Sequence, residues 1–359
     1  MNTPHISVHT MNTPHISVLL PVYNNVQYLK KAVLSILQQS FTNFEIILID
    51  DGSSDGTEHL AQQLAEQDAR IRLVQRPNKG LIASLNEGIN LVRSPFIARM
   101  DADDFSFPNR LSIQYAYMTD HPDVVAVGSY IKFMDNHDRM YRKKIFSSGQ
   151  KLLDDFRWGC PLVHPAVMMR TDAVQKIGGY SPEFPSAEDY ALWLRMLSCG
   201  RMDTIPQVLL AYRVHGQSIS HVHARQQRDS ILRAQAIWLS GQEWTRDICQ
   251  LSATQLLNSL LSPEEQRELL ARMLALNPHL IGVSPEQDPE AQEWLPCVLQ
   301  GDITPEIRKA LALYHLRAAR AQGLSTGSRL YHLCQCALYS PGEFMKKMTE
   351  FLCGRLQCR

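Results

Sequence analysis

The sequence has no apolar run long enough to cross a membrane and no recognisable export signal. Its longest apolar runs, such as FEIILI and ISVLLPV, are far shorter than the roughly 20 residues that a bilayer-spanning helix needs. The first ten residues, MNTPHISVHT, lack the basic region and the apolar core of a signal peptide. We therefore predict no transmembrane helix and a cytoplasmic location.

The sequence also lacks an excess of charge and a cysteine framework. Lys and Arg total 36, as do Asp and Glu, so the formal net charge is zero. This balance argues against a general nucleic-acid binder, because such proteins are usually basic. The eight cysteines follow no regular spacing and are expected to be reduced thiols. A length of 359 residues allows one large domain and a smaller one.

The octapeptide MNTPHISV occurs twice, at residues 1–8 and again at residues 11–18. Only the second copy continues into LLPVYN, so we expect residues 1–10 to be a disordered duplication without function. Residues 11–223 are predicted to form the main domain and residues 224–359 a helical C-terminal region. The end of that region, residues 327–359, is basic and amphipathic. It is expected either to contact an anionic membrane surface or to pack as an ordinary helix.

Between residues 15 and 130, short apolar segments alternate with helical patterns. HISVLLPVY, FEIILID and PFIARM predict buried strands, and IRLVQR predicts a shorter one. NNVQYLKKAVLSILQQ, SDGTEHLAQQLAEQ and LIASLNEGINLV predict helices. This alternation predicts an α/β fold whose sheet is mainly parallel and flanked by helices.

Three of the predicted strands end in polar residues: PVYN at 21–24, DDGS at 50–53 and DADD at 101–104. Ligands of such sheets bind outside the carboxyl ends of the strands, so we expect these segments to line one crevice. Their carboxylates would repel one another unless a cation lies between them. Hard oxygen ligands favour Mn²⁺ or Mg²⁺, which also attract a diphosphate. Helix capping explains one aspartate of DADD but not three, and neither DADD nor DGSSDG completes a calcium-binding EF-hand loop.

Seven motifs occur in an order typical of one enzyme family: SVLLPVYN, IILIDDGSSDGT, NKGLIASLN, FIARMDADD, HP, AEDYALWLRM and YRVHGQSIS. In these motifs, over about residues 15–222, the sequence resembles the inverting family 2 glycosyltransferases. Each motif alone is a weak signal, but seven in order make a specific match. The resemblance implies the Rossmann-like GT-A fold and a nucleotide-sugar donor.

The resemblance also implies a donor site. Pro21 and Tyr23 are expected to border the nucleobase, Asp51 to hydrogen-bond uracil, and Asp101 to lie near the ribose. Asp50 is expected to support its turn.

Many relatives carry Ala-Arg before the asparagine of NKGLIASLN, where the arginine meets phosphate. Ser84-Leu85 stands there in this sequence, so Lys79 is the candidate for that positive charge.

For the metal, the resemblance implies that Asp103 is a ligand of Mn²⁺ or Mg²⁺ and that Asp104 supports the turn. His215 resembles a histidine that reaches the metal or the diphosphate, and Arg213 could pair with phosphate.

Asp189 resembles the catalytic base of the family, with Glu188 in a supporting role. The residues alone allow another interpretation of Asp189. Ser186 and Asp189 have the spacing of a capping box before an apolar helix, and an acidic residue in a first turn favours the helix dipole.

The predicted reaction is transfer of one sugar from a UDP-sugar to a hydroxyl of a carbohydrate or glycolipid acceptor, with inversion, in surface-polysaccharide assembly. The sequence contains no Gln-x-x-Arg-Trp motif of processive polymer synthases, which favours single transfer. Two alternatives stay open: a sugar-phosphate nucleotidyltransferase, although PVYNNVQ is not a glycine-rich phosphate loop, and a non-catalytic nucleotide-sugar-binding protein.

Overall fold

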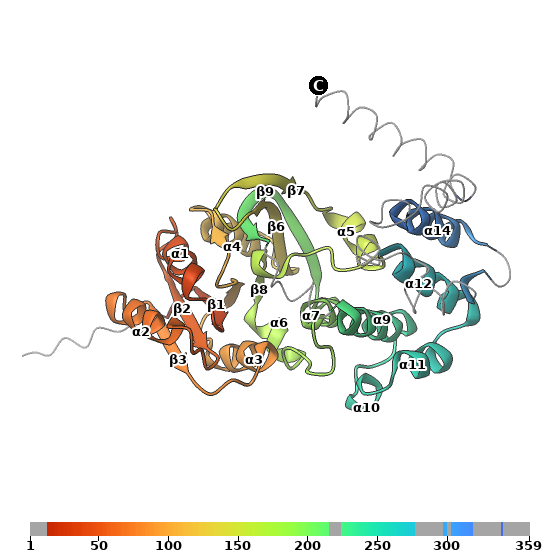
Figure 1. The fold of residues 1–359 in the computed structure, drawn as a ribbon, viewed down its shortest axis with the longest axis horizontal. Coiled ribbons are helices and arrows are strands. Elements are labelled where there is room, and N and C mark those ends of the chain that lie inside the picture. Colours follow the sequence, from red (N-terminus) through yellow and green to blue (C-terminus); the bar gives the residue numbers. More distant parts are fainter. Residues whose placement is uncertain (1–12, 215–223, 277–296, 300–302, 319–338, 340–359) are drawn as a thin grey trace, which may run out of the picture. The chain divides into compact units, whose positions relative to one another are not determined.

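The computed structural model describes residues 13–214, 224–276, 297–299, 303–318 and 339 (Figure 1). The chain divides into two compact units. The first unit comprises Met1–Asp155, Cys160–Pro182 and Arg195–Gly216, and the second comprises Phe156–Gly159, Glu183–Leu194 and Gln217–Arg359. The units therefore do not follow a single cut in the sequence, and the boundary predicted between residues 223 and 224 stays a prediction. Residues 1–10, for which we predicted disorder, lie outside the described residues. The same is true of residues 327–338 and 340–359, nearly all of the segment predicted to be basic and amphipathic.

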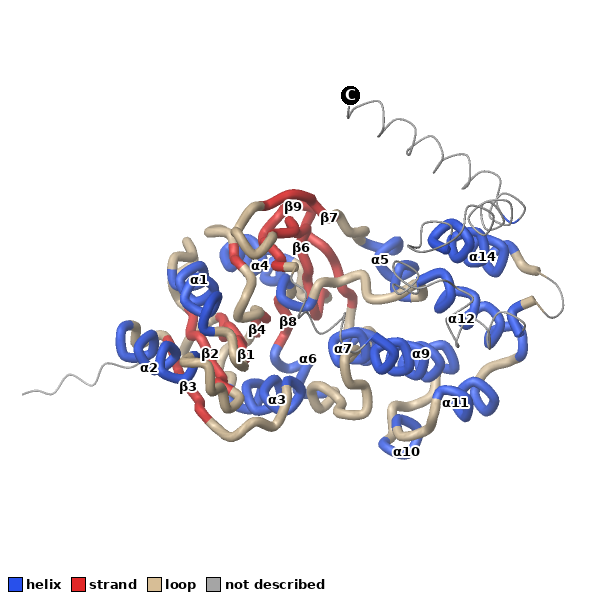
Figure 2. The backbone as a smooth tube through the Cα atoms, in the orientation of Figure 1, coloured by secondary structure: helices blue, strands red, loops and turns tan. Residues whose placement is uncertain are grey.

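All described strands belong to the first unit, as the red segments of Figure 2 show. They are β1 (Ile16–Val22), β2 (Phe44–Asp50), β3 (Ile71–Gln75), β4 (Phe96–Arg99), β5 (Phe105–Ser106), β6 (Val124–Met134), β7 (Met140–Lys144), β8 (Met168–Arg170) and β9 (Arg201–Arg213). The described helices of this unit are α1 (Val26–Leu37), α2 (Thr57–Gln67), α3 (Leu81–Leu91), α4 (Arg110–Asp120), α5 (Gly149–Phe156, whose last residue belongs to the second unit), a 3₁₀ turn (His164–Ala166) and α6 (Thr171–Lys176).

The strands form one mixed sheet in the order β3-β2-β1-β4-β8-β6-β9-β5, with β7 paired to β6. The neighbouring strands β3, β2, β1 and β4 are parallel to one another. β8 lies between β4 and β6 and is antiparallel to both, and β6 and β9 are parallel. The chain moves outward from β1 to β3 and then returns to place β4 on the other side of β1. The carboxyl ends of β1 and β4 therefore flank the topological switch point, where open α/β sheets bind their ligands.

The continuous apolar run of β1 is explained by burial of both faces of the strand. Val18 and Leu20 belong to a core that also contains Leu29 and Val33 of α1. Leu19 points the other way, toward α3, where a Cβ added to Gly88 would lie 2.1 Å from Leu19 Cδ1. Because helices cover both faces, the strand needs no alternation of apolar and polar residues. The predicted α/β fold with a mainly parallel sheet flanked by helices is confirmed.

The second unit is helical. α7 (Glu188–Met196) begins in this unit and ends in the first, and it is followed by α9 (Ala224–Ser240), α10 (Arg246–Cys249), α11 (Ala253–Leu260), α12 (Pro263–Leu276) and α14 (Pro305–Ala318). Gln235 of α9 donates to the hydroxyl of Tyr190 at 2.8 Å, and Tyr190 donates to the carbonyl of Phe156. These bonds join three separate segments of the chain into one unit. Among the described helices, none is long and apolar enough to cross a membrane.

Candidate functional site

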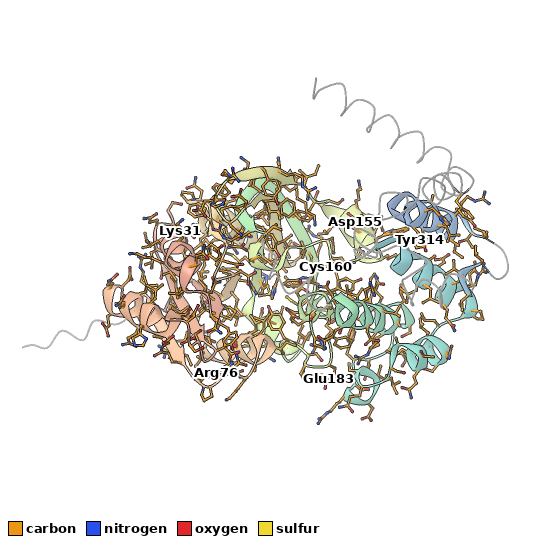
Figure 3. The ribbon with its side chains drawn as sticks, in the orientation of Figure 1. Lys31, Arg76, Asp155, Cys160, Glu183 and Tyr314 are labelled. Atoms are coloured by element: carbon orange, nitrogen blue, oxygen red, sulfur yellow. The ribbon has the colours of Figure 1, made fainter. Side chains whose placement is uncertain are left out.

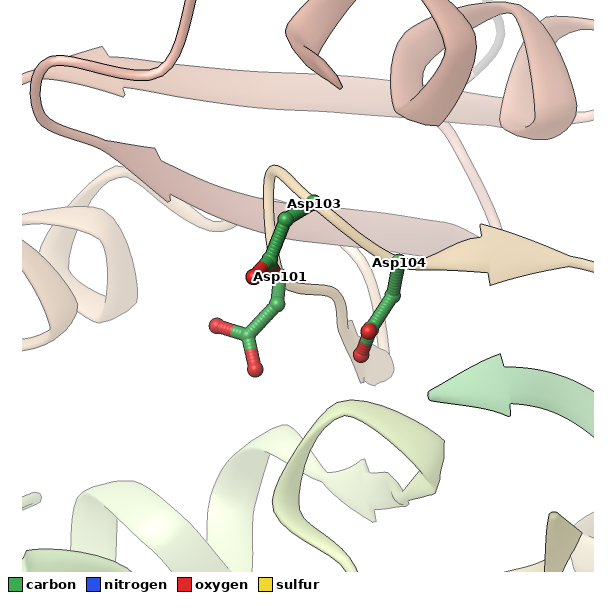
Figure 4. Close-up of side chains that lie close together, drawn as sticks. All are labelled: Asp101, Asp103 and Asp104. Atoms are coloured by element: carbon green, nitrogen blue, oxygen red, sulfur yellow. The ribbon is translucent and has the colours of Figure 1, made fainter. Parts of the chain in front are cut away.

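Three carboxylates gather immediately after β4, in the segment that we expected to line the crevice. One oxygen from each of Asp101, Asp103 and Asp104 lies within 4.8 Å of the others. Figure 4 shows the three side chains on one short turn that leads from β4 into β5. The turn is held at both ends. The N–H of Met100 donates to the carbonyl of Leu19 at 3.1 Å, and β5 pairs with β9.

Asp101 is paired with a cation that the sequence analysis missed. Arg99, the last residue of β4, forms an ion pair with Asp101, and its side chain is only 2% exposed. The carbonyl of Arg99 in turn accepts a 2.7 Å hydrogen bond from the guanidinium of buried Arg110. Burial raises the pKa of Asp101, and the charge of Asp103 adds to this effect, while Arg99 opposes it. An arginine inside an otherwise apolar strand, two residues before an aspartate, was the available signal.

Asp104 is fixed by the backbone of β9. Its Oδ1 accepts a 2.8 Å hydrogen bond from the N–H of Arg213, and the Nε of Arg213 donates to the carbonyl of Asp103 at 2.8 Å. Burial raises the pKa of Asp104 well above its usual value, and the charges of Asp103 and Asp101 raise it further. These contacts join the turn to β9, and the supporting role of Asp104 stays a prediction.

The cluster fits a divalent cation. Asp104 Oδ2 is buried, and no hydrogen-bond partner for it occurs among the described residues, which is costly for a carboxylate oxygen unless a ligand lies against it. All three side chains offer hard oxygen donors, the type that Mg²⁺ and Mn²⁺ prefer. Burial raises the pKa values of Asp101 and Asp104, and the repulsion from neighbouring aspartates raises them further. A cation would relieve that repulsion.

Asp51 connects the end of β2 to the loop before α3. Its Oδ1 and Oδ2 accept hydrogen bonds from the N–H groups of Lys79 and Gly80 at 2.9 and 2.8 Å. Gly52 allows this close approach, because a Cβ at its position would lie 2.6 Å from the backbone nitrogen of Asn78, and its φ is +77°. A carboxylate has about four acceptor positions, so Asp51 retains capacity for the hydrogen bond to a base that we predicted.

Arg76 is a second cation that the sequence analysis missed (Figure 3). Its Nη1 lies 2.6 Å from Asp51 Oδ1 and its Nε lies 2.7 Å from Glu87 Oε2, while its side chain is 7% exposed. Nη2 donates to Ser84 Oγ at 2.8 Å. Arg76 directly follows β3. Its position at the carboxyl end of a parallel strand, where ligands of such sheets bind, was the available sequence signal.

The remaining donor-site predictions lie around the ends of β1 and β2. Pro21 is buried within β1, and Tyr23 directly after it is 54% exposed. Asp50 accepts a 3.1 Å hydrogen bond from the N–H of Ser53 within the turn that follows β2. Lys79 is exposed. Tyr23 and Lys79 are therefore accessible to a ligand outside the ends of the strands.

Arg213 is less accessible than its predicted phosphate contact suggests. Its side chain is 2% exposed. The guanidinium donates to the carbonyl oxygens of Asp103 and Asp135 and to Asp138 Oδ1, at 2.8, 2.7 and 2.7 Å, and it stacks on the ring of Tyr28. The structure thus shows Arg213 as a clamp on the aspartate turn, and its pairing with phosphate stays a prediction.

His164, from the HP motif, is buried near Arg99. Its Nε2 lies 2.7 Å from the hydroxyl of Tyr180. Burial lowers the pKa of His164 well below its usual value, and the neighbouring Arg99 cation lowers it further. His164 is therefore neutral near pH 7, so it adds no second positive charge beside Arg99.

The predicted catalytic base is located on another part of the chain. Asp189 and the buried Glu188 form the first turn of α7, and both belong to the second unit. The Oδ1 of Asp189 accepts a hydrogen bond from the N–H of Tyr190 at 2.7 Å. The acidic cluster belongs to the first unit, so the joining of Asp189 to that cluster stays a prediction. His215 lies outside the described residues.

Comparison with known proteins decides the family. The model of glycosyl transferase family 2 matches residues 17–178. The O-antigen biosynthesis glycosyltransferase WbnJ of Escherichia coli is 33% identical over 207 residues, which cover 56% of this chain and 80% of that protein. The chain belongs to glycosyl transferase family 2. Another relative of this glycosyltransferase, the amylovoran biosynthesis glycosyltransferase AmsE of Erwinia amylovora, is 31% identical over 56% of this chain and 77% of its own length.

Solved structures show the same fold as this family 2 glycosyltransferase. TarS of S. aureus (residues 1–349), solved in complex with UDP-GlcNAc, matches with a TM-score of 0.57 and 17% identity, over 90% of this chain and 88% of that one. The mannosyltransferase PcManGT of Pyrobaculum calidifontis, in complex with GDP-Man and Mn²⁺, matches with a TM-score of 0.54 and 17% identity, over 91% and 85%. The family and the GT-A fold predicted from the motifs are confirmed.

Proposed function

We propose that this glycosyltransferase moves one sugar from a UDP-sugar to a hydroxyl group of a carbohydrate or glycolipid acceptor, with inversion and with the help of Mn²⁺ or Mg²⁺. The observation that carries the proposal is the cluster of Asp101, Asp103 and Asp104 at the carboxyl end of β4. That end flanks the switch point of the sheet, on which the Asp51 loop also converges. A nucleoside diphosphate matches both features, because the acidic turn can hold the cation that diphosphates require.

We assign different parts of the nucleotide-sugar donor to different residues of the first unit. Asp51 would accept a hydrogen bond from the base, Pro21 and Tyr23 would border it, and Asp101 would contact the ribose. Lys79 is the exposed cation available to the diphosphate. Asp50 and Asp104 would keep the two turns in place.

Asp103, with His215, would hold the divalent cation, which neutralises the charge of the departing diphosphate when it is bound. Arg213 would fix the backbone of Asp103 and, on the prediction from the family, contact phosphate.

Asp189 would take the proton of the acceptor hydroxyl while that oxygen attacks the anomeric carbon, with Glu188 positioning the first turn of α7. Such a single displacement inverts the configuration and needs no nucleophilic side chain. The positioning of donor and acceptor in one crevice would supply the rest of the rate enhancement.

The relatives support an acceptor in surface-polysaccharide assembly, because WbnJ is named for O-antigen biosynthesis and AmsE for amylovoran biosynthesis. Glycans of that kind are built on lipid-linked precursors, which fits an enzyme that works at the cytoplasmic face of a membrane. The domains that we propose for this role are residues 11–223 for transfer and residues 224–359 as a helical extension.

A panel of nucleotide sugars tests the proposal. TarS is described with UDP-GlcNAc and PcManGT with GDP-Man, so the panel should include both UDP- and GDP-sugars, each with and without Mn²⁺. We expect slow release of UDP from one UDP-sugar in the presence of Mn²⁺ only. Release of GDP alone would contradict the proposed UDP-sugar donor. Activity in EDTA would contradict the proposed dependence on a divalent cation, and formation of pyrophosphate would indicate a nucleotidyltransferase.

A further inference from the structure

The hairpin of β6 and β7 presents an unusual surface. We define the basic hairpin as residues 130–146. Every residue of β7 is exposed, although the strand pairs along one edge with Ile131–Met134 of β6 (Figure 1). Large apolar side chains are exposed on it as well: Met140 is 40%, Tyr141 60% and Ile145 66% exposed. Exposed apolar groups gathered on one element indicate an interaction surface.

The same hairpin is rich in cations. Residues 130–146 contain two carboxylates, Asp135 and Asp138 at the tip, and five basic residues: Lys132, Arg139, Arg142, Lys143 and Lys144. Within the described part of the chain, no carboxylate lies at ion-pair distance from Lys132, Arg142, Lys143 or Lys144. Lys132 and Lys143 even face each other directly in the antiparallel register, an arrangement of like charges that destabilises a hairpin. An anion between the two ammonium groups would remove that cost.

Protection of a sheet edge explains only part of this pattern. Lysines on an edge strand prevent it from pairing with a second copy. Exposed apolar side chains such as Tyr141 and Ile145 do not contribute to that protection. A soluble polyanion would form ion pairs with the cations, but it would also leave Tyr141 and Ile145 exposed to water. The surface of an anionic bilayer satisfies both, because headgroups attract Lys and Arg while Tyr and Ile enter the interfacial layer.

We infer that the basic hairpin is a docking surface for an anionic lipid membrane. The cations would lie among the headgroups, with Tyr141 and Ile145 inserted between them. Stacking already orients several of these cations: Arg142 lies 4.6 Å above the ring of Phe133 and Lys143 lies 4.8 Å above the ring of Tyr130. Stacking on these rings restricts the cationic side chains before binding, which limits the entropy lost on binding.

The hairpin is linked to the aspartate turn. Its tip, between β6 and β7, contains Asp135 and Asp138, and both accept hydrogen bonds from Arg213 at 2.7 Å. The same guanidinium donates to the carbonyl of Asp103. A membrane bound to this hairpin would therefore lie close to the turn that carries the acidic cluster. Docking itself does not depend on the identity of the donor or the acceptor.

Sedimentation of the full chain with vesicles tests the docking surface. We compare phosphatidylcholine vesicles with vesicles that also contain phosphatidylglycerol, and expect binding to rise with the anionic fraction. Lys132→Glu/Lys143→Glu should weaken binding about ten-fold or more, since each cation near an anionic surface contributes about 1 kcal/mol. Its matched control, Lys30→Glu/Lys176→Glu, changes two exposed lysines outside the hairpin by the same charge and should keep most of the affinity.

The apolar contribution is tested separately. Ile145→Ser should weaken binding several-fold, whereas Leu299→Ser, at another exposed apolar residue (42% exposed), should not. Thermal melts show that each variant is folded. Vesicle binding that is unaffected by the hairpin variants, or reduced equally by the controls, would overturn the inference. So would a chain that binds heparin through the hairpin lysines but no anionic vesicle, or a hairpin that only joins two copies of the chain in size-exclusion chromatography.

Discussion

The backbone N–H of Arg213, at the end of β9, donates a 2.8 Å hydrogen bond to Asp104 Oδ1, 109 residues earlier in the chain. The guanidinium of the same residue holds the carbonyl of Asp103. The conformation of the acidic turn therefore depends on a strand that lies much later in the sequence. Metal binding and the integrity of β9 should be coupled through this one residue.

Arg213→Met tests that coupling. It removes a buried cation that donates hydrogen bonds to three acceptors, so we expect a loss of about 2–4 kcal/mol in the free energy of unfolding. We also expect an Mn²⁺ affinity at least about ten-fold weaker, measured by calorimetry below the melting temperature. Arg139→Met is the control, because Arg139 is 76% exposed and should change stability by less than about 0.5 kcal/mol. An unchanged Mn²⁺ affinity of Arg213→Met would show that the clamp does not position the metal ligands.

Asp103→Asn tests the ligand itself. Replacement of the carboxylate by an amide removes one negative charge from the cluster, so we expect Mn²⁺-dependent UDP binding to weaken about ten-fold or more. Stability should change little or even rise, because the mutual repulsion of the three aspartates decreases. Asp120→Asn, an exposed position on α4, is the control for charge. If Asp103→Asn binds UDP and Mn²⁺ like the unmodified protein, the metal-ligand role is refuted.

Asp189→Asn separates catalysis from binding. A general base contributes about 10²–10⁴-fold to a rate, so transfer should fall by that factor while UDP affinity changes less than about two-fold. The competing explanation of Asp189 as a helix cap predicts instead an unchanged rate and little change in stability, because asparagine also caps helices and only the favourable interaction of the charge with the helix dipole is lost. Asp247→Asn, at an exposed position of the second unit, is the control. Unchanged turnover would exclude Asp189 as the base.

Gly52→Ala should separate the two loops that Asp51 joins. The added Cβ would lie 2.6 Å from the nitrogen of Asn78, at a φ of +77°, so we expect a loss of about 2–4 kcal/mol in the free energy of unfolding and weaker UDP binding. Gly149→Ala is a close control, since Gly149 has a φ of +57° but no atom within 4 Å of an added Cβ. It should show only the backbone strain, about 1–2 kcal/mol. Equal losses in urea denaturation would mean that the contact with Asn78 is unimportant.

The dependence of stability on pH should reveal Asp203. Burial alone would raise its pKa, but the hydroxyl of Tyr117, the N–H groups of Thr204 and Gly149, and the Arg201 cation together hold it below the usual value. A carboxyl with a lowered folded-state pKa stabilises the protein above its unfolded pKa of about 3.9, and this contribution is lost as pH falls through the folded pKa.

Asp203→Asn should therefore be less stable by about 1–3 kcal/mol at pH 7, and its stability should depend less on pH below about pH 5. Urea denaturation at a series of pH values measures this effect, with Asp120→Asn as the control. A variant whose pH profile stays parallel to that of the unmodified protein would contradict the prediction.

The local sequence determined the elements and the place of the acidic cluster in the sheet. Strands such as β1 and β4 are visible as apolar runs because helices cover both faces of the sheet, and the aspartates stand out because acidic residues rarely cluster after a buried strand. The parallel order then placed Asp51 and the DADD segment at the same edge of the sheet. That much depends only on neighbours along the chain and on the handedness of βαβ connections.

The partners of those aspartates were decided by the tertiary structure. Arg76, Arg99 and Arg213 neutralise or fix Asp51, Asp101 and Asp104, yet nothing in the sequence pairs Arg213 with a residue more than 100 positions away. Buried carboxylates need compensating charge, and only the folded chain selects which cation provides it. The same reason explains why Arg213, predicted from the motif as a phosphate ligand, is seen as a clamp. Side-chain composition shows which chemistry is available, whereas packing decides how each group is used.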